Sequence, residues 1–423
     1  MANTVIQMAN YLSTLLKKIP DMVEVKFKTN NRFFADIAQK KDNETFYVTV
    51  EYAKGGGFQG YDMDSLTDQI GYSSTPSMIQ PYDSMVDIIA FQKITKKAIE
   101  RSASPESIKA LAAKLYSDVS ENLVKHIKFH WYLPTTNNVL ATYTDGGSGT
   151  TISTSGTSIT LNASPTGSTP SYGAWFLRIG MVVDLYEGSS KKGTAIVTGI
   201  NSDRKTVTLA AIGSNITISA SADVNIYAQG MYGKTVNSFG FIASTSRTLH
   251  NIDSSSNAFW DGTVVDAGGS ANLTVQKIRD LLYEIENLPY DVDVTKYNVA
   301  FTTRKQLEKL EADIIDSVTY QISSATKKDL DYGSFYLTVD GVNVYYDPLV
   351  PPGVLYLPHF DYLEFKYAKK PEWMKLGGDI LHPDSLSTPQ VLRAVLTYTG
   401  QFACSLPPVQ GKIIKMSNDF DFS

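Results

Sequence analysis

The chain has 423 residues, of which 43% are hydrophobic and 19% are charged, and its formal net charge is -5 at pH 7. This length and composition exclude a disordered protein and predict two or three folded domains. The acidic balance excludes a general electrostatic attraction to phosphate backbones or anionic membranes. A single cysteine, Cys404, excludes an intramolecular disulfide and a cysteine-based zinc cluster, so we expect a buried, inert thiol.

The sequence contains no pattern of a membrane span or a secretory leader. Its apolar runs stay well below the roughly 20 residues that a helix needs to cross a bilayer. The segment from Met1 to Tyr11 has neither the basic nor the apolar region of a secretory signal. We therefore expect a protein that is made in a cytosol and has no membrane partner.

The first part of the chain predicts an arm followed by a loop between two strands. The apolar spacing from Met1 to Pro20 predicts a short amphipathic helix that needs a partner surface. Strands are predicted at Phe46 to Tyr52 and around Met85 to Ile94, and the polar and aromatic segment from Lys54 to Asp83 predicts a long projecting loop between them. Loops of more than roughly 12 to 15 residues in a compact domain are usually functional or disordered.

A glycine-rich run in this loop formally matches a dinucleotide-binding turn. Gly55 to Gly60 follows a predicted strand and has the G-x-G-x-x-G spacing. However, Asp62, Asp64 and Asp68 stand where the phosphate-binding helix should begin, and their charges would repel a pyrophosphate. No βαβ crossover follows the run. The pattern therefore favours a flexible loop tip, and we predict no cofactor.

One long helix is predicted after the loop. Ser104 suits the N-cap, Pro105 the first helical position and Glu106 the first turn. Apolar residues then recur with a helical period up to Trp131, just before Pro134, which predicts some 25 residues of helix with a length of roughly 40 Å. So long a helix favours a spine that crosses an extended, flat subunit.

Two histidines on this helix are the only arrangement that points to a metal. His126 and His130 stand four residues apart, so both could reach one ion. The residues between them lack the glutamate of the H-E-x-x-H pattern, and no third ligand is indicated nearby. Packed or surface-facing histidines are the favoured interpretation, and the sequence has neither a nucleophile elbow nor a phosphate-binding loop. We predict no metal site, no catalytic residue and no enzyme.

The segment from Pro134 to Tyr232 predicts a separate β domain inserted into the chain. Only 10 of these 99 residues are charged, against 71 of the remaining 324. Ser, Thr and Gly crowd its first part, and polar and apolar residues alternate in its second, ordered half. The alternating segments predict the strands of a small antiparallel sandwich or barrel: Thr194 to Thr198, Lys205 to Leu209, Asn215 to Ile218 and Asp223 to Tyr227. Few charges and no catalytic residue types favour a surface decoration or contact module.

The rest of the chain predicts an α+β fold. Asp340-Gly341 is a preferred two-residue turn for a hairpin. The predicted elements are a helix at Asn272 to Asn287, a strand at Tyr297 to Phe301, a helix at Thr303 to Ile315, the hairpin Phe335 to Val339 with Val342 to Tyr346, and paired strands of the main sheet at Val391 to Gly400 and Gln401 to Ile414.

Aromatic side chains concentrate in and around the predicted loop. The group consists of Tyr47, Tyr52, Phe58, Tyr61, Tyr72 and Tyr82. They cannot all face the core of this chain, and protein interfaces favour aromatic residues. We therefore predict an assembly interface at Tyr52, Phe58, Tyr61 and Tyr72. The alternative is a tyrosine-rich surface on a monomer.

Two groups of motifs resemble the major capsid proteins of tailed bacteriophages, which have the Hong Kong ninety-seven-type capsid fold. The first group lies in the insert: Phe176 to Tyr186, Thr206 to Leu209 and Asp223 to Tyr227 resemble the inserted domain of one large group of these shells. The second group lies near the C-terminus: Pro352-Gly353, Pro371-Glu372-Trp373, Gly378 to Leu381, Phe402-Ala403-Cys404 and Gly411-Lys412-Ile413 resemble the closing pattern of that group. In the family a Gly often precedes the Asp of the last insert motif, whereas Asp223 follows Ala222.

The resemblance implies an α+β capsid fold in which an axial domain meets its neighbours at the centres of hexamers and pentamers. An extended loop would lie over the adjacent subunit. The implied regions are an N-terminal arm (1–30), the extended loop region (31–103), the spine helix of the peripheral domain (104–133), the inserted all-β domain (134–232), a return to the peripheral domain (233–286), the axial domain (287–347) and the C-terminal part of the peripheral and axial sheets (348–423).

The resemblance also implies a function and its partners. Copies of one chain would form an icosahedral head, a virion capsid made in the host bacterial cytoplasm, that encloses double-stranded DNA without sequence-specific binding. The segment before the loop is too short for a fused scaffolding domain, so a separate scaffolding protein is expected, together with a portal protein and a decoration protein. Some members cross-link their subunits, and Lys54 would be the first lysine to suspect, but no Asn and Glu partners are identifiable.

Three other classes of protein stay open. A tail component of a phage would share the structural role. A nanocompartment shell would share the fold, but such subunits resemble the family without so large a β insert. A cell-surface β-sandwich adhesin would explain the Ser- and Thr-rich insert, but the missing leader and the long helix count against it.

Overall fold

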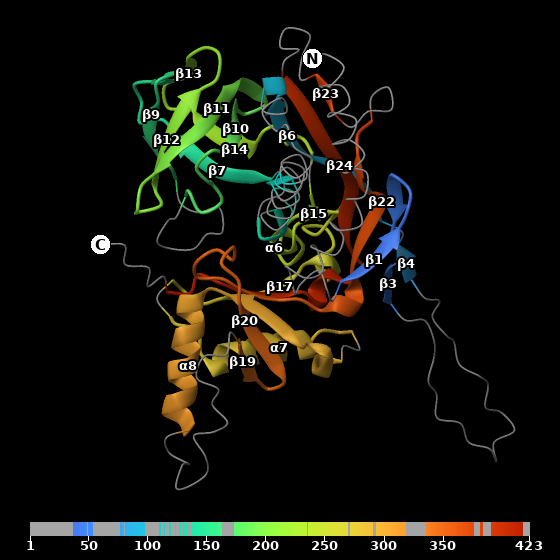
Figure 1. Ribbon diagram of the computed structural model, residues 1–423. Coiled ribbons are helices and arrows are strands. Elements are labelled where there is room, and N and C mark those ends of the chain that lie inside the picture. The colour runs from blue at the N-terminus through green and yellow to red at the C-terminus, as the bar shows by residue number, and fades with distance from the viewer. Residues whose placement is uncertain are drawn as a thin grey trace, which may run out of the picture.

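The computed structural model contains three main β-sheets among the described residues (Figure 1). The insert and a five-stranded sheet occupy the upper part of the view, and a six-stranded sheet with two helices lies below them. The residues that the structure describes are 37–48, 50–53, 77–79, 81–97, 110, 114, 118–119, 123, 127, 130–133, 138–162, 173–234, 236–269, 271–290, 293–318, 336–375, 381–383 and 391–417. The predicted arm at 1–30 lies outside them.

The first sheet is organised around the long strand β24 (Val391–Cys404). Strands β6 (Val86–Thr95), β22 (Leu363–Trp373) and β23 (His382–Pro383) all pair with it in antiparallel fashion. Strand β1 (Ala38–Lys41) adds to β22 in parallel. The extended stretch predicted around Met85 is confirmed as β6.

The base of the predicted loop is a set of short antiparallel pairs. Strand β2 (Thr45–Tyr47) pairs with β5 (Tyr82–Ser84), and β3 (Val50–Ala53) pairs with β4 (Ser77–Ile79). The single strand predicted at Phe46 to Tyr52 is therefore divided, and the prediction of loop structure is wrong for residues 77–79 and 82–83. The ladders give these backbone groups hydrogen-bond partners that an open loop would have to find in water.

The described residues of the predicted spine helix are helical up to Trp131. Val119, Leu123, Ile127 and Trp131 are buried in the same core cluster as residues of the first sheet. Because they stand four residues apart, they share one face of a helix. His130 is buried as well, whereas His126 lies outside the described residues.

The insert is a six-stranded antiparallel sheet with an additional two-stranded pair. The sheet has the order β7-β14-β10-β11-β12-β9, and β8 pairs with β13. The strands are β7 (Val139–Thr144), β8 (Thr150–Ile152), β9 (Thr157–Thr160), β10 (Val182–Glu187), β11 (Ser190–Ile200), β12 (Thr206–Ala211), β13 (Ile216–Ile218) and β14 (Asp223–Ala228).

All four strands predicted in the second half of the insert are confirmed, as β11 to β14. The implied lack of order in the first half is wrong, because β7, β8 and β9 lie there. Asp145 organises the turn between β7 and β8, since its carboxylate accepts hydrogen bonds from the backbone N–H groups of Gly147 and Gly149, both at 2.9 Å. These bonds and one from the Thr150 hydroxyl hold the pKa of Asp145 well below its usual value.

The chain returns from the insert through several short elements. Ser238 caps the first of them, and its hydroxyl oxygen accepts a hydrogen bond from the N–H of Phe241 at 3.0 Å. The elements are α6 (Phe239–Ile242), β15 (Thr248–Leu249), β16 (Ile252–Asp253) and the 3-10 helix η1 (Ala258–Trp260).

The second sheet has the order β17-β25-β21-β18-β20-β19. The sheet is mixed. The pairs β17–β25 and β18–β20 are parallel, and its other pairs are antiparallel. The strands are β17 (Thr263–Asp266), β18 (Val299–Thr302), β19 (Tyr336–Val339), β20 (Val342–Tyr346), β21 (Leu355–Leu357) and β25 (Gly411–Ile414). The 3-10 helix η2 (Val294–Lys296) precedes β18, whereas η3 (Phe360–Tyr362) and η4 (Pro407–Val409) lie in connections between the first and second sheets.

Two helices complete a second core on this sheet. Helix α7 (Val275–Glu286) begins after the N-cap Thr274 and buries Ile278, Leu281 and Ile285. Helix α8 (Arg304–Val318) buries Leu310 in the same cluster. Gly411 of β25 allows α7 to approach closely, because a Cβ atom there would lie 3.1 Å from the side chain of Ile285. The helices and the hairpin predicted for this half are confirmed, with shifted ends.

The C-terminal prediction was partly wrong. Val391 to Cys404 forms one strand of the first sheet, whereas β25 belongs to the second sheet, and the two strands do not pair with each other. The short helix η4 separates them, because Pro407 and Pro408 interrupt the alternating pattern. The second sheet combines strands from 287–347 with β21 and β25 from 348–423, the range predicted for the peripheral and axial sheets, and with β17 from 233–286.

Candidate assembly surfaces

Two tyrosines mark the outer face of the loop base. Tyr47 of β2 lies opposite Tyr82 of β5, and their ring centroids are 6.1 Å apart. The two residues are 60% and 50% exposed. The preceding residue of β2, Phe46, lies opposite Asp83 and is buried on the other face, as the alternation of a strand requires. The loop base therefore exposes an aromatic pair on one face and buries Phe46 on the other.

The inner face of the loop base is fixed by a buried histidine. Oδ2 of Asp83 lies 3.1 Å from Nδ1 of His250 and accepts a hydrogen bond from Nδ2 of Asn237 at 2.7 Å. Nε2 of His250 accepts a hydrogen bond from the N–H of Cys404 at 3.2 Å, so the ring nitrogen that faces Asp83 carries the proton of a neutral imidazole. Burial acts to raise the pKa of Asp83, but the contacts with His250 and Asn237 lower it overall.

A lysine attaches the other side of the loop base to β22. Nζ of Lys366 lies 2.9 Å from both Oδ2 of Asp42 and the carbonyl oxygen of Tyr47, and it stands 5.0 Å from the ring centroid of Phe46. The lysine side chain is only 10% exposed. Lys366 therefore ties β2 to the first sheet, and Asp83 ties β5 to His250 and Asn237.

Strand β6 has apolar residues on both of its faces. Val86, Ile88, Ala90 and Ile94 are buried, whereas Ile89 and Phe91 on the opposite face are 57% and 46% exposed. In register with them on β24 lie Thr397 and Val395. An apolar sheet face left open to solvent is typical of a contact surface.

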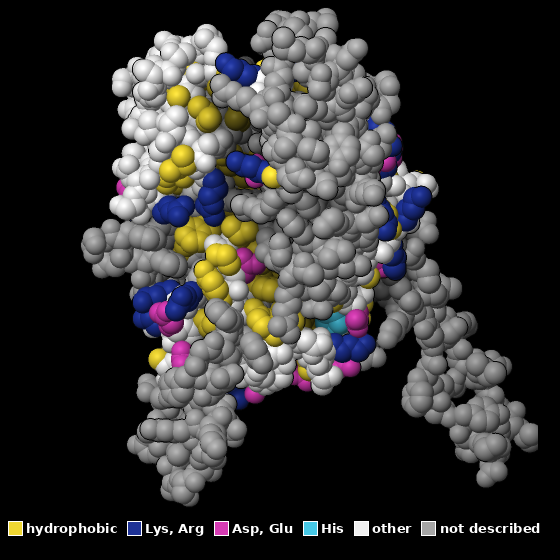
Figure 2. All heavy atoms as spheres, viewed as in Figure 1, with side chains coloured by type: hydrophobic (Ala, Val, Ile, Leu, Met, Phe, Trp, Pro, Cys, Tyr) yellow, Lys and Arg dark blue, Asp and Glu magenta, His cyan; other side chains and the backbone are white. Residues whose placement is uncertain are grey.

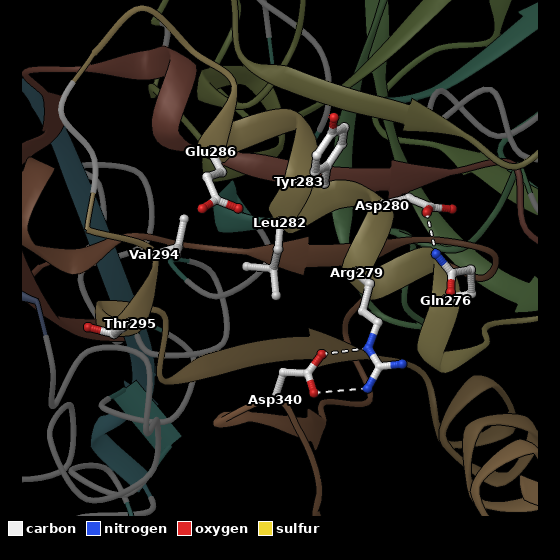
Figure 3. Close-up of a pocket in the computed structure, with 9 residues that line it drawn as sticks. All are labelled: Gln276, Arg279, Asp280, Leu282, Tyr283, Glu286, Val294, Thr295 and Asp340. Atoms are coloured by element: carbon white, nitrogen blue, oxygen red, sulfur yellow. Dashed lines mark hydrogen bonds and ion pairs between the residues drawn. The ribbon is translucent and has the colours of Figure 1, made fainter.

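An open groove lies between α7, η2 and the tip of the β19–β20 hairpin (Figure 3). Its volume is about 530 Å³. Arg279 and Asp340 form a two-pronged ion pair at one side, with N–O distances of 2.7 and 3.1 Å, and Tyr283 is 64% exposed. Asp280 and Glu286 also line the groove. With three carboxylates and one guanidinium, the groove suits contact with a cationic partner. Its lining does not place a nucleophile beside a general base, so it does not resemble an active site.

The structure places few of the residues predicted for the interface. Tyr52 lies in β3, and Phe58, Tyr61 and Tyr72 lie outside the described residues, as do Lys54 and the glycine-rich run. Sequence reasoning missed Ile89, Phe91 and the α7 groove. The unbroken apolar run Ile88-Ile89-Ala90-Phe91 was a usable signal, because a strand that needs apolar residues on both faces is covered on both faces.

The geometry of the described residues supports neither a metal site nor a reactive thiol. Within the described part of the chain, no group of three His, Cys, Asp or Glu side chains is arranged to hold a metal ion. Cys404 is buried, and burial raises the pKa of its thiol to about 12. Among the helices described, none is long and apolar enough to cross a membrane.

The comparisons with known proteins show a likeness in structure and none in sequence. No protein-family model matches the sequence, and no annotated protein matches it. Among solved structures, a chain of the cyanophage A-1(L) capsid asymmetric unit is similar, with a TM-score of 0.51, 12% sequence identity and coverage of 90% of each chain.

Two further solved structures are similar at lower TM-scores. The capsid of a native GTA particle has a TM-score of 0.42 and 11% identity, with coverage of 90% of this chain and 88% of that chain. Mycobacterium phage Bobi has a TM-score of 0.43 and 8% identity, with the same coverage. The likeness to the A-1(L) chain, which exceeds a TM-score of 0.5 over nearly all of both chains, shows that this chain has the fold of a bacteriophage capsid protein.

Proposed function

We propose that the chain is the major capsid protein of a tailed bacteriophage. Copies of it would assemble as hexamers and pentamers into an icosahedral head that encloses double-stranded DNA. The observation that carries the proposal is the fold shared with the A-1(L) capsid chain over 90% of both chains. The proposed location is the virion, after synthesis in the cytoplasm of the host bacterium.

The surfaces of the described residues suit a subunit that functions by contact. A shell subunit needs several separate contact areas, because each copy meets neighbours on all sides. The aromatic pair Tyr47 and Tyr82 and the apolar pair Ile89 and Phe91 lie on different strands and are exposed. The α7 groove gives a further area, of polar character. This distribution supports a structural role.

The loop is the proposed anchor on a neighbouring subunit, with Tyr52, Phe58, Tyr61 and Tyr72 as contact residues. It would act as an arm held by the β2–β5 and β3–β4 ladders. Replacing both Phe58 and Tyr61 by Ala should block shell formation and leave a folded chain, because aromatic anchors carry much of the energy of an interface. The matched control replaces Ile179 and Ile212 by Ala, which are 67% and 51% exposed on the insert. Normal shells from the loop variant would refute this assignment.

Further partners follow from the same proposal. We propose a separate scaffolding protein, a portal protein and a decoration protein. The net charge of -5 favours an inner wall that encloses DNA and binds it only weakly, because a basic wall would bind the phosphates strongly. The axial domain is proposed within the second sheet, and the peripheral domain in the first sheet with the helix at 104–133.

Sedimentation of the soluble chain tests the proposal. The chain would be expressed alone and together with its neighbouring genes. Discrete fast-sedimenting species under either condition, with the size of capsomers or shells, support the proposal. A persistent monomer under both conditions would overturn it and favour an adhesin, and open tubes would favour a tail component.

A further inference from the structure

A buried histidine lies where the chain passes from the second sheet to the first. His359 follows β21 and precedes η3 and β22, and it is 2% exposed. The chain makes the reverse passage from β24 through η4 to β25. A group that holds these two passages together therefore influences the position of one sheet against the other.

The two passages are tied to each other at His359. Its N–H donates a hydrogen bond to Oε1 of Gln410 at 2.9 Å, and Nε2 of Gln410 donates one to the carbonyl oxygen of His359 at 3.1 Å. The Tyr297 hydroxyl, which follows η2, donates a hydrogen bond to the carbonyl oxygen of Val409. A displacement of His359 would thus be felt in both passages and in the segment after η2.

The imidazole ring of His359 packs against two tyrosines and lacks a hydrogen-bond partner. Its centroid lies 4.7 Å from that of Tyr297, edge to face, and 4.9 Å from that of Tyr362. Both ring nitrogens are buried, and neither makes a hydrogen bond to the residues that the structure describes. The backbone of Asp293 faces the ring without reaching hydrogen-bond geometry. Buried polar groups without a partner are rare, and strain or a functional role often accounts for them.

Charged groups on η2 and η3 surround the ring at the surface. Asp293 caps η2, which contains Lys296, and Asp361 of η3 lies 2.9 Å from Nζ of Lys296. Figure 2 shows acidic, basic and histidine side chains close together at the lower right of this face. Burial lowers the pKa of His359 below 6.5, and the charges of Asp361 and Asp293 only partly offset it. The two tyrosines carry no charge at acid pH, so the ring is neutral until a proton binds.

We propose that His359 is an acid-sensitive switch in the junction between the two sheets. At neutral pH the uncharged ring packs between the tyrosines, and the His359–Gln410 pair holds the two passages together. When a ring nitrogen accepts a proton from solvent, the buried site offers the new charge no acceptor. The ring then moves outward to Asp293 and Asp361, the pair with Gln410 opens, and the second sheet is freed to move against the first. The switch does not depend on the formation of a shell.

Amide hydrogen exchange of the full chain tests the switch. Exchange is compared at about pH 7 and about pH 5, after correction for the intrinsic effect of pH on exchange. In the wild type, the protection of η3 and η4 should fall by up to about tenfold per pH unit below about 6.5, because the open form has the higher pKa and binds the proton first. The insert contains no histidine, so its protection should not change. Equal protection of η3 and η4 at both pH values would overturn the proposal.

Two variants assign the response to one histidine. His359→Phe keeps an aromatic ring between the tyrosines but has no titratable nitrogen, so the protection of η3 and η4 should be the same at both pH values. His250→Gln is the matched control, because His250 accepts a hydrogen bond from the N–H of Cys404 near η4 and Gln retains an acceptor. This control should keep the full acid response. A response that persists in the Phe variant, or disappears in the Gln variant, would overturn the assignment.

Distances between the two sheets test the movement itself. Spin labels are attached to Lys369→Cys on β22 and Glu284→Cys on α7, which are both exposed, whereas the native Cys404 is buried. The distribution of distances between the labels should shift or broaden at about pH 5 in the wild-type background and stay unchanged with His359→Phe. The same distribution at both pH values in the wild-type background would show that protonation does not move the sheets, and would overturn the switch.

Discussion

The buried side chains of Lys412 and Arg247 both donate hydrogen bonds at the C-terminal end of α6. Nζ of Lys412 donates hydrogen bonds to the carbonyl oxygen of Gly240 at 3.0 Å and to Oγ of Ser244 at 2.6 Å. The guanidinium of Arg247 donates to the carbonyl oxygens of Ile242 and of Trp260. Carbonyl groups at the C-terminal end of a helix attract cations. The pair thus joins β25 of the second sheet to the segment that returns from the insert.

Lys412 should make the stability of the chain depend on pH. Burial, and then the charge of Arg247, lowers the pKa of Lys412 from 10.5 to about 7. Because the folded pKa lies below the unfolded one, the unfolded chain binds more protons between these values, and the free energy of unfolding rises with pH from about 7 to 10. The slope from this group is at most about 1.4 kcal/mol per pH unit.

Lys412→Met should remove that slope. Urea unfolding at pH 7, 8 and 9 measures it, and Lys415→Met is the matched control because Lys415 is exposed and pairs with Asp266. Equal slopes in the wild type and in the Lys412 variant would show that Lys412 does not titrate in this range.

Asp83→Asn should loosen the base of the loop. The carboxylate contacts His250 and Asn237, and hydrogen bonds to charged groups contribute about 1.5 to 3 kcal/mol. The pKa of Asp83 is lowered from 3.8, so its stabilisation is present above about pH 4 and is lost as the pH falls through the folded pKa. Amide hydrogen exchange in β2 and β5 measures the change. Exchange as slow as in the wild type, with the exposed Glu44→Gln as control, would contradict the role of Asp83.

Gly341→Ala should destabilise the hairpin of the second sheet. Gly341 has a φ of 86°, which an L side chain adopts at a cost of about 1 to 2 kcal/mol. No atom lies within 4 Å of a Cβ added at Gly341 or at Gly146, and only Gly341 has a left-handed φ. Gly146→Ala is therefore the matched control and should be neutral or slightly stabilising. Thermal unfolding measures the change in the free energy of unfolding for both variants. Equal melting temperatures for the two variants would show that the left-handed conformation of Gly341 does not destabilise the Ala variant.

Ile89→Lys combined with Phe91→Glu should block assembly without unfolding the chain. Both side chains are about half exposed on the open face of β6, so charges there are tolerated in the isolated chain. In an assembled shell they would have to be buried against a neighbour, at high cost. The control Lys93→Glu changes a charged, exposed position of the same strand. The prediction fails if the double variant forms normal shells, as judged by sedimentation.

Local sequence patterns correctly predicted several strands of the insert, the hairpin of the second sheet and α7. The alternation in the insert located β11 to β14, and Asp340-Gly341 located the hairpin, because its two residues adopt φ angles of 48° and 86° as a preferred turn requires. The apolar spacing between Asn272 and Asn287 located α7. These features depend on neighbours within a few residues.

Pairing between distant segments was not predictable in the same way. Nothing in the sequence near Val391 indicates that β24 and β25 enter different sheets, because that choice depends on partners more than a hundred residues away, such as Thr263 of β17. The Ser- and Thr-rich strands β8 and β9 lack strong alternation and form through their partners β13 and β12. The interface prediction rested on aromatic residues alone, so it missed Ile89 and the polar groove of α7.

Electron microscopy of the expressed chain tests the central claim most directly. The soluble fraction, from the chain alone and with its neighbouring genes, would be imaged in negative stain and then reconstructed from frozen particles. The account predicts closed polyhedral shells or capsomer rings of five and six copies, in which the second sheets surround the ring centres. Particles without fivefold and sixfold rings, or a stable monomer under both conditions, would contradict it.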